Sequence, residues 1–164
     1  MQFEFRNATA EDFKVIAAFP QNEEESFFMF PSGKYPLTGE QLEEAAAKRF
    51  SPTVILHDGE VVGYSNFYGV QNGVDCWLGN AIVHPNYRRS GVGSYLIETM
   101  KNRALNEYAV KELKLVCHHT NTSALLFYHK NAFKPFDWIV MQNQNGDKVV
   151  GIKMSISLES LASS

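Results

Sequence analysis

The stretch of residues 81–94 constrains the fold of this chain more than any other part of the sequence. It reads Ala-Ile-Val-His-Pro-Asn-Tyr-Arg-Arg-Ser-Gly-Val-Gly-Ser, an apolar run followed by a turn with two arginines and two glycines. Gly91 and Gly93 lack a Cβ, so the backbone there can approach a ligand closely. The helix expected over residues 92–108 would present unpaired N–H groups and a positive dipole end at the same place. The pattern therefore predicts a strand, an anion-binding turn and a helix.

This glycine turn differs from the two common nucleotide-binding loops. No lysine follows Gly93, as a P-loop requires, and Leu96 stands where a dinucleotide-binding fingerprint has its third glycine. Glycines between a strand and a helix can also do no more than turn the chain. Taken by itself, the glycine turn therefore fits both an anion-binding site and a simple turn of the chain.

Length and composition indicate one domain. The chain has 164 residues, of which 45% are hydrophobic, enough for one packed core. We expect a domain over residues 1–158 and a loose tail over residues 159–164. No apolar run approaches the roughly 20 residues of a membrane span, and a charged and then apolar leader pattern is missing, so we expect a cytoplasmic protein without a membrane partner. Cys76 and Cys117 show no CxxC spacing and are expected to be free, with no metal bound.

Charge is distributed unevenly along the chain. Residues 1–60 carry 11 acidic and 5 basic side chains, whereas residues 81–135 carry 8 basic and 3 acidic ones. The basic segment contains the glycine turn, which favours a small polyanion as ligand. A nucleic-acid or protein-binding domain that uses this basic face is one functional hypothesis, and the acidic first third of the chain counts against it. We expect no nucleic-acid partner.

Hydrophobic periodicity and turn signals predict an alternation of strands and helices. Asp58-Gly59 and Asn72-Gly73 mark hairpin turns, and Thr38 with Gln41 matches a helix-capping box. The expected strands cover residues 3–6, 53–57, 61–70, 74–83, 112–117, 133–142 and 148–157, and the expected helices cover residues 9–18, 22–29, 41–50, 92–108 and 121–131.

This order of elements, with Arg88-x-x-Gly91-x-Gly93 after the fourth strand, resembles the GCN5-related N-acetyltransferase (GNAT) superfamily, whose signature is Gln/Arg-x-x-Gly-x-Gly/Ala. A second region, residues 121–133, is similar to the family pattern Asn-x-x-Ala-x-x-x-Tyr-x-x-x-Gly-Phe. It departs from that pattern at Asn131-Ala132, where glycine is usual before Phe133. The resemblance covers nearly the whole chain.

The resemblance implies an α/β fold of the α+β type. It would be a single GNAT domain with a central, mixed, mostly antiparallel sheet of about seven strands, flanked by about four helices, with strands four and five splayed apart. It also implies an acetyl-CoA-dependent N-acetyltransferase that moves an acetyl group to a primary amine by direct attack in a ternary complex. The alternative is an acyl-CoA-binding module without catalysis.

The resemblance also implies a binding set for the cosubstrate acetyl-CoA. The edge of the fourth strand would pair with the pantetheine arm, the amides of residues 89–94 would hold the pyrophosphate, and an asparagine side chain would touch the pantetheine or acetyl region. The implied residues are Ala81, Ile82, Val83, Arg88, Arg89, Ser90, Gly91, Val92, Gly93, Ser94, Asn121 and Tyr128.

Tyr128 occupies the general-acid position of the family. A phenol with a pKa of about 10 is protonated at neutral pH and can donate to a departing thiolate. The alternative is a tyrosine that packs the helix against the sheet. Many relatives have a glutamate on the fourth or fifth strand as general base, but this chain has Asn80 and Val116 in those regions, and Asp75 is the only acidic residue of the fourth strand. A water chain, a glutamate of residues 23–25, or the titratable His118 and His119 remain open.

The resemblance places the acceptor between the first helices and the sheet. The candidate residues there are Glu24, Phe28, Tyr35, Tyr64, Asn66 and Trp77. Such an aromatic and partly acidic lining suits a cationic or hydrophobic amine. The alternative is that the same aromatic residues belong to the protein core, which is the more common place for such residues at strand positions. The acceptor's identity, the length of the acyl group, and the choice between monomer and homodimer are left open by the sequence.

Overall fold

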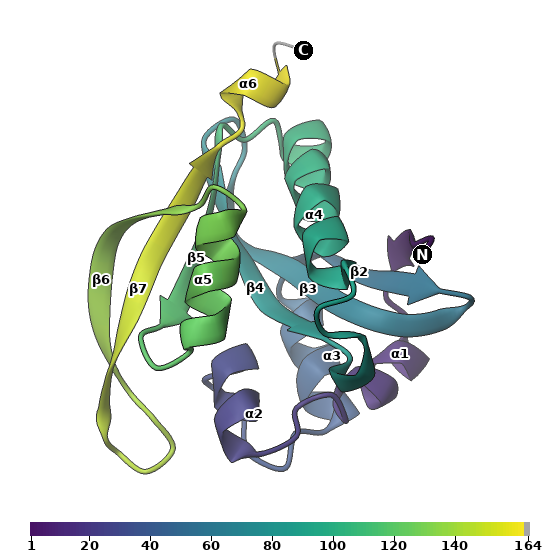
Figure 1. The fold of residues 1–164 in the computed structure, drawn as a ribbon, viewed down its shortest axis with the longest axis vertical. Coiled ribbons are helices and arrows are strands. Elements are labelled where there is room, and N and C mark those ends of the chain that lie inside the picture. Colours follow the sequence, from purple (N-terminus) through teal and green to yellow (C-terminus); the bar gives the residue numbers. More distant parts are fainter. Residues whose placement is uncertain (163–164) are drawn as a thin grey trace.

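The computed structural model describes residues 1–162 of the chain (Figure 1). Its elements, in order, are β1 (Glu4–Asn7), α1 (Ala10–Ile16), α2 (Glu23–Met29), α3 (Gly39–Ala47), β2 (Phe50–His57), β3 (Glu60–Gln71), β4 (Asp75–Val83), the 3-10 turn η1 (Pro85–Tyr87), α4 (Val92–Tyr108), β5 (Glu112–His118), α5 (Thr122–Lys130), β6 (Lys134–Gln142), β7 (Lys148–Ser157) and α6 (Glu159–Ala162).

The strands form one seven-stranded sheet in the order β1-β2-β3-β4-β5-β7-β6. All neighbours are antiparallel except β4 and β5, which run parallel. These two strands pair only from Asp75↔Glu112 to Trp77↔Lys114 and then diverge (Figure 1). The predicted mixed sheet and the splay of its fourth and fifth strands are confirmed. Beyond Trp77, the β5-facing edge of β4 has no strand partner.

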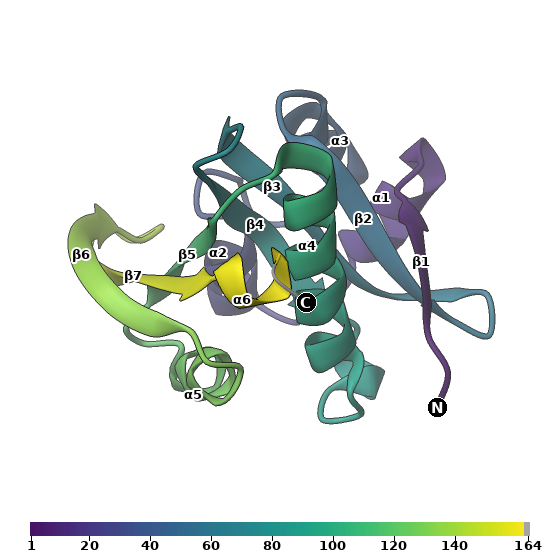
Figure 2. The same ribbon diagram turned by 90° about the horizontal axis from the view of Figure 1, so that it is seen from above.

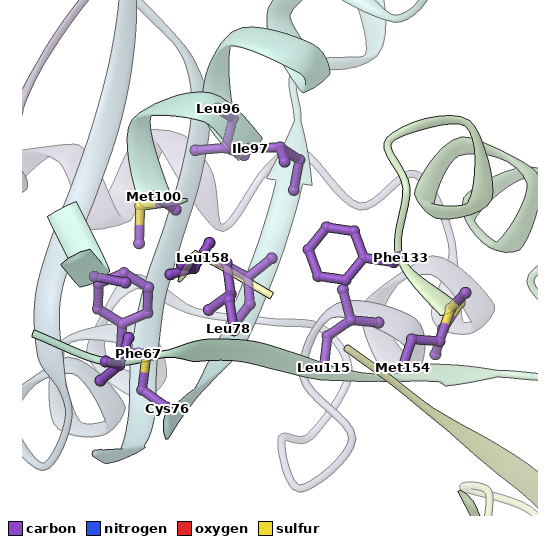
Figure 3. Close-up of a cluster of buried hydrophobic side chains, with 14 of the residues drawn as sticks. Phe67, Cys76, Leu78, Leu96, Ile97, Met100, Leu115, Phe133, Met154 and Leu158 are labelled. Atoms are coloured by element: carbon purple, nitrogen blue, oxygen red, sulfur yellow. The ribbon is translucent and has the colours of Figure 1, made fainter. Parts of the chain in front are cut away.

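Helices cover both faces of the sheet. α4 lies on one face, whereas α1 and α3 lie on the other (Figure 2). The α4 side holds the larger cluster of buried side chains, with Met100, Leu113 and Phe133 fully buried. Figure 3 shows how this cluster joins α4 to β3, β4, β5 and β7 through Phe67, Leu78, Leu96, Leu115 and Met154. This buried cluster therefore holds α4 against the strands of the sheet in which β4 and β5 diverge.

The first helix begins with a local network of charges and hydrogen bonds. The Asp12 carboxylate accepts hydrogen bonds from the Thr9 N–H at 2.7 Å and from Arg6 Nη1 at 2.6 Å. Burial opposes ionisation of this carboxyl, but the bonds from Arg6 and Thr9 outweigh it and lower the pKa of Asp12. This network fixes the start of α1, as the acidic residue of a capping box does.

Two of the differences from the sequence-based boundaries affect the site and the C-terminal segment. The helix expected over residues 41–50 ends at Ala47, because the chain turns there into β2 at Phe50. Arg49 therefore lies at a junction and not on a helix face. The expected loose tail is also wrong in part, because Glu159–Ala162 form the short helix α6, and Leu161 packs against the core. Residues 163 and 164 of that predicted tail lie outside the described residues.

The described chain contains six α-helices, where about four were expected. Of these helices, α6 is the one that the expected ranges did not include, and both α6 and α2 are short. α2 starts at the side chain of Asn22, which accepts a hydrogen bond from the Glu25 N–H at 2.9 Å, and α6 follows the fully buried Leu158. Short helices like these depend on capping and on tertiary contacts.

The outer strand β6 exposes apolar side chains. Its exposed members are Phe136, Trp138, Ile139 and Val140, and Trp138 is 63% exposed. β6 is also the last strand of the sheet and pairs on one side only, with β7. An open edge with apolar side chains is a surface on which a further strand or chain can pack.

Candidate active site

A cleft of about 970 Å³ opens where β4 and β5 diverge. Its walls come from β4, β5, α2, α4, α5 and the β6–β7 pair. Eight residues of the predicted cofactor set line it, namely Ala81, Ile82, Val83, Arg88, Arg89, Gly93, Asn121 and Tyr128. The splay of two strands thus brings both sequence motifs to one hollow.

The turn before α4 presents a row of free N–H groups. Gly91 is the N-cap of α4 and adopts φ +93°, a left-handed conformation that favours glycine. Within the described chain, no N–H group of residues 89–94 donates a hydrogen bond to another protein group. Free N–H groups at the start of a helix, together with its dipole, attract anions. The turn therefore has the form of an anion-binding site.

The remaining four residues of the predicted set do not line the cleft with their side chains. Val92 is fully buried in the core, and Ser94 is exposed. The Ser90 hydroxyl donates to the carbonyl oxygen of Tyr87. At these positions and at Gly91, only the backbone N–H groups are available to a ligand.

Arg88 and Glu25 connect the glycine turn to α2. Arg88 Nη2 and Nη1 donate to the two carboxylate oxygens of Glu25 at 2.8 Å and 3.2 Å. The bond from Arg88, helped by the Gln21 N–H, lowers the pKa of Glu25. Both residues of this ion pair line the cleft.

Asn121 and Tyr128 lie on α5, as the second motif predicts. Asn121 is the N-cap of this helix, and its Oδ1 accepts a hydrogen bond from the Ala124 N–H at 3.4 Å. Burial raises the pKa of the Tyr128 phenol, and the Cys117 thiol adds to that effect. Among the described residues, the Tyr128 hydroxyl has no hydrogen-bond partner. A protonated phenol with a free hydroxyl is therefore available in the cleft.

His118 is a buried titratable residue at the end of β5. It is 3% exposed, stacks on Phe27 at 4.6 Å and on Phe28 at 5.8 Å between ring centroids, and lines the cleft. Its Nε2 is shielded from water and has no partner in the part of the chain that the structure describes. Burial, with a smaller effect of His119, lowers the pKa of His118. The imidazole is therefore neutral at pH 7.

Arg49 reaches the cleft from the junction before β2. Its Nη1 donates to Asn66 Oδ1 at 3.2 Å and to Asn80 Oδ1 at 2.9 Å. The guanidinium carbon lies 4.8 Å from the centre of the Tyr68 ring, which also lines the cleft. Sequence reasoning missed Arg49 because it was assigned to a helix. The signal that could have found it is an arginine placed just before a buried strand.

The structure brings only two of the six predicted acceptor residues to the cleft, Glu24 and Phe28. Tyr64 and Asn66 are fully buried, because Tyr64 packs in the core with Phe13 and accepts a hydrogen bond from Asn66 Nδ2. Burial raises the pKa of Tyr64 to about 12. These two residues are thus corrected from acceptor contacts to interior residues.

The other two predicted acceptor residues also lie outside the cleft lining. Tyr35 is 49% exposed in the loop before α3. Trp77 stacks on Tyr68 and faces Phe136 of β6, with Lys114 5.7 Å above its ring. The Trp77 indole packs in this surface cluster, so its predicted role as an acceptor contact is replaced by a packing role.

Other features of the described chain bear on the chemistry available. Cys76 and Cys117 are free and buried, and burial raises the pKa of each thiol to about 12. Within residues 1–162, no three His, Cys, Asp or Glu side chains are grouped to hold a metal ion. None of the helices in that range has the length and apolar character needed to cross a bilayer.

Solved structures share this fold at low sequence identity. Spermidine N-acetyltransferase from Vibrio cholerae, in complex with CoA and spermine, has a TM-score of 0.79 and 17% identity over 96% of each chain. Ard1 from Thermoplasma volcanium has a TM-score of 0.76 and 17% identity over 96% of this chain and 98% of its own. The ribosomal-protein-S18-alanine N-acetyltransferase from Escherichia coli has a TM-score of 0.71 and 17% identity over 96% of this chain and 94% of its own.

None of the curated proteins matches the chain. The model of the acetyltransferase (GNAT) family matches residues 15–133, which hold both motifs and the three helices that line the cleft, α2, α4 and α5. Since that match covers most of the sequence, the chain belongs to the GNAT family of acetyltransferases.

Proposed function

We propose that this protein transfers the acetyl group of acetyl-CoA to a primary amine by direct attack in a ternary complex. The observation that carries the proposal is the row of free N–H groups at residues 89–94, set beside an unpaired strand edge in one cleft. This combination fits a ligand that has both a pyrophosphate and an amide-bearing arm.

Each part of the cleft has a task in binding the donor. The amides of residues 89–94, with Arg88 and Arg89, bind the pyrophosphate. The open edge of β4 at residues 81–83 pairs with the pantetheine amides in the manner of an added strand. Asn121 uses its Oδ1 to cap α5, so its Nδ2 is the group that reaches the ligand.

The bound thioester supplies an activated acetyl carbonyl. The N–H of Ile82 or Val83 donates to the carbonyl oxygen, on which negative charge develops during attack. Tyr128 gives its phenolic proton to the CoA sulfur as the C–S bond breaks. Its raised pKa keeps the proton in place until a thiolate forms.

The amine must lose a proton as its bond to the acetyl carbon forms. His118 is the neutral base best placed for this step, since it lines the same cleft and its Nε2 has no protein partner among residues 1–162. The cleft-lining segments of β4 and β5, residues 78–83 and 115–118, contain no carboxylate. In this proposal a histidine takes the place of the glutamate that many relatives carry on the fourth or fifth strand.

We further propose that the enzyme acts in the cytoplasm as a monomer or as a homodimer. The open edge of β6, with Trp138 and Val140 exposed, supports the homodimer. Light scattering on the wild type and on Trp138→Lys separates the two states. If the protein is a homodimer through β6, we expect the wild type to be dimeric and Trp138→Lys to be monomeric.

A thiol-release assay with acetyl-CoA and a panel of amines tests the proposed activity. We expect amine-dependent CoA release, and a loss of roughly 100-fold in kcat for Tyr128→Phe with acetyl-CoA affinity retained. The lack of a carboxylate on the cleft-lining segments of β4 and β5 supports one alternative, an acyl-CoA-binding module without catalysis. Binding of acetyl-CoA without turnover of any amine would favour that alternative.

A further inference from the structure

Arg49 is a cation in the cleft that no carboxylate of the described chain neutralises. The two N–H groups of its Nη1 donate to neutral amide oxygens of Asn66 and Asn80. Its Nη2 and Nε have no partner among residues 1–162, and none of the ion pairs found there includes it. Burial lowers the pKa of Arg49, but an arginine stays charged at neutral pH. Three donors on a fixed cation are therefore left for a ligand.

The surroundings hold the Arg49 guanidinium in a defined place. Asn80 Nδ2 donates to the Met29 carbonyl oxygen at 2.9 Å, and Asn66 Nδ2 donates to Asn80 Oδ1 at 2.9 Å. A Cβ at Gly79 would collide with Nη1 of Arg49, so the missing side chain makes room for the guanidinium against β4. An anchored guanidinium presents its remaining N–H groups in a planar fork that matches a carboxylate.

The charges that line the cleft also favour an anionic group on the acceptor. Arg88 and Arg89 belong to the proposed pyrophosphate site, and Glu25 is paired with Arg88. Arg49, together with Lys153 and Glu24, remains for the acceptor. A polycation would meet two positive charges and one negative charge there, whereas an ammonium and a carboxylate on one molecule match Glu24 and Arg49.

We propose that the acceptor is an amine that carries a carboxylate, as an α-amino acid does, and that the Nη2 and Nε of Arg49 bind this carboxylate. The inference rests on the proposed acetyltransferase function and specifies its acceptor class. Asn80, which holds Arg49, directly precedes the 81–83 edge assigned to the donor. In an α-amino acid the amine and the carboxylate share one carbon, so a carboxylate bound at Arg49 keeps the amine next to that edge.

Matched pairs of acceptors test this assignment. We would measure kcat/KM for the common L-amino acids, for their α-carboxamides and for spermidine, with wild type, Arg49→Gln, Arg49→Lys and Lys48→Gln. We expect the wild type to prefer at least one acid over its amide by roughly 10- to 100-fold. Arg49→Gln should raise the KM for the acid and so bring the acid-to-amide ratio of kcat/KM close to one. Arg49→Lys should restore that ratio in part.

The acid-to-amide ratio does not depend on the fraction of folded enzyme, so it separates binding from a folding defect. Lys48→Gln removes a neighbouring positive charge from an exposed side chain and should keep the wild-type ratio. Equal turnover of acids and amides by the wild type, or a preference for spermidine, would overturn the proposal. If no amine is acetylated, thermal shifts still decide it. Stabilisation of the wild type but not of Arg49→Gln by an amino acid supports the carboxylate site, and equal shifts refute it.

Discussion

Arg88 of the glycine turn and Glu25 of α2, 63 residues apart in sequence, form a two-bond ion pair at the cleft, with Nη2 2.8 Å from Oε1. Under the proposed function, the guanidinium of Arg88 serves the pyrophosphate of the donor. In the protein without ligand, the Glu25 carboxylate is therefore bound to the same Arg88 guanidinium that the pyrophosphate would bind. The two anions compete for one guanidinium.

Glu25→Gln removes this internal competitor. We expect acetyl-CoA to bind more tightly to the variant, by at most about fivefold, because partly exposed ion pairs contribute about 0.2–1 kcal/mol. Arg88→Gln should weaken binding instead. Titration calorimetry with acetyl-CoA measures both variants, and weaker binding by Glu25→Gln would show that the pair organises the site.

Ala132 has φ +71° in the turn before Phe133, where the GNAT pattern has glycine. A left-handed conformation costs a non-glycine residue about 1–2 kcal/mol. We therefore expect Ala132→Gly to raise the free energy of unfolding by about 1 kcal/mol, measured by urea denaturation. Ala124→Gly on α5 is the opposite control and should lower it by a similar amount. A lower stability of Ala132→Gly would contradict this account.

His118 links stability to pH. The folded protein lowers its pKa below that of the unfolded chain, so between the two values the unfolded state binds more protons. Stability should therefore fall as pH drops below about 6.5. The charge of His119, the next residue in the chain, adds to this lowering of the pKa, and Glu24, Glu25 and Lys153 line the same cleft.

His118→Phe removes this titration and the unpaired Nε2. We expect a gain of about 1 kcal/mol at pH 6 and a flatter stability curve between pH 5 and 7, because Phe27 and Phe28 already pack on this ring. If His118 is the base, acetyl transfer should fall even though stability rises. His129→Phe, on an exposed position of α5, is the control and should leave the pH curve unchanged.

The sequence predicted the fold well because its strongest signals are local. The Asx-Gly turns, the helix from Val92 and the hairpin ending in the 148–157 strand all lie where expected. The cleft wall that holds Ala81, Ile82, Val83, Asn121 and Tyr128 was also predictable, since both motifs are short and come from the elements that flank the cleft.

The acceptor side was predicted poorly because it is assembled by tertiary contacts. Tyr64 and Trp77 lie on adjacent strands and looked equivalent in sequence, yet one is in the core and the other packs against β6. Arg49 enters the cleft only because α3 ends early at Ala47. His118 is buried because Phe27 of α2 stacks on its ring, and a contact between such distant segments cannot be predicted from a local sequence pattern.

Titration of acetyl-CoA into the wild type, Gly91→Val and Gly59→Val tests the central claim most directly, that the turn before α4 binds the donor. Gly59 also has positive φ, +78°, but lies in a hairpin turn with no atom within 4 Å of its missing Cβ. Both variants place a β-branched side chain at a positive φ, so Gly59→Val controls for that kind of backbone strain. The account predicts saturable one-to-one binding by the wild type and Gly59→Val, and at least roughly tenfold weaker binding by a folded Gly91→Val. Wild-type affinity in Gly91→Val, or no binding by the wild type, would contradict it.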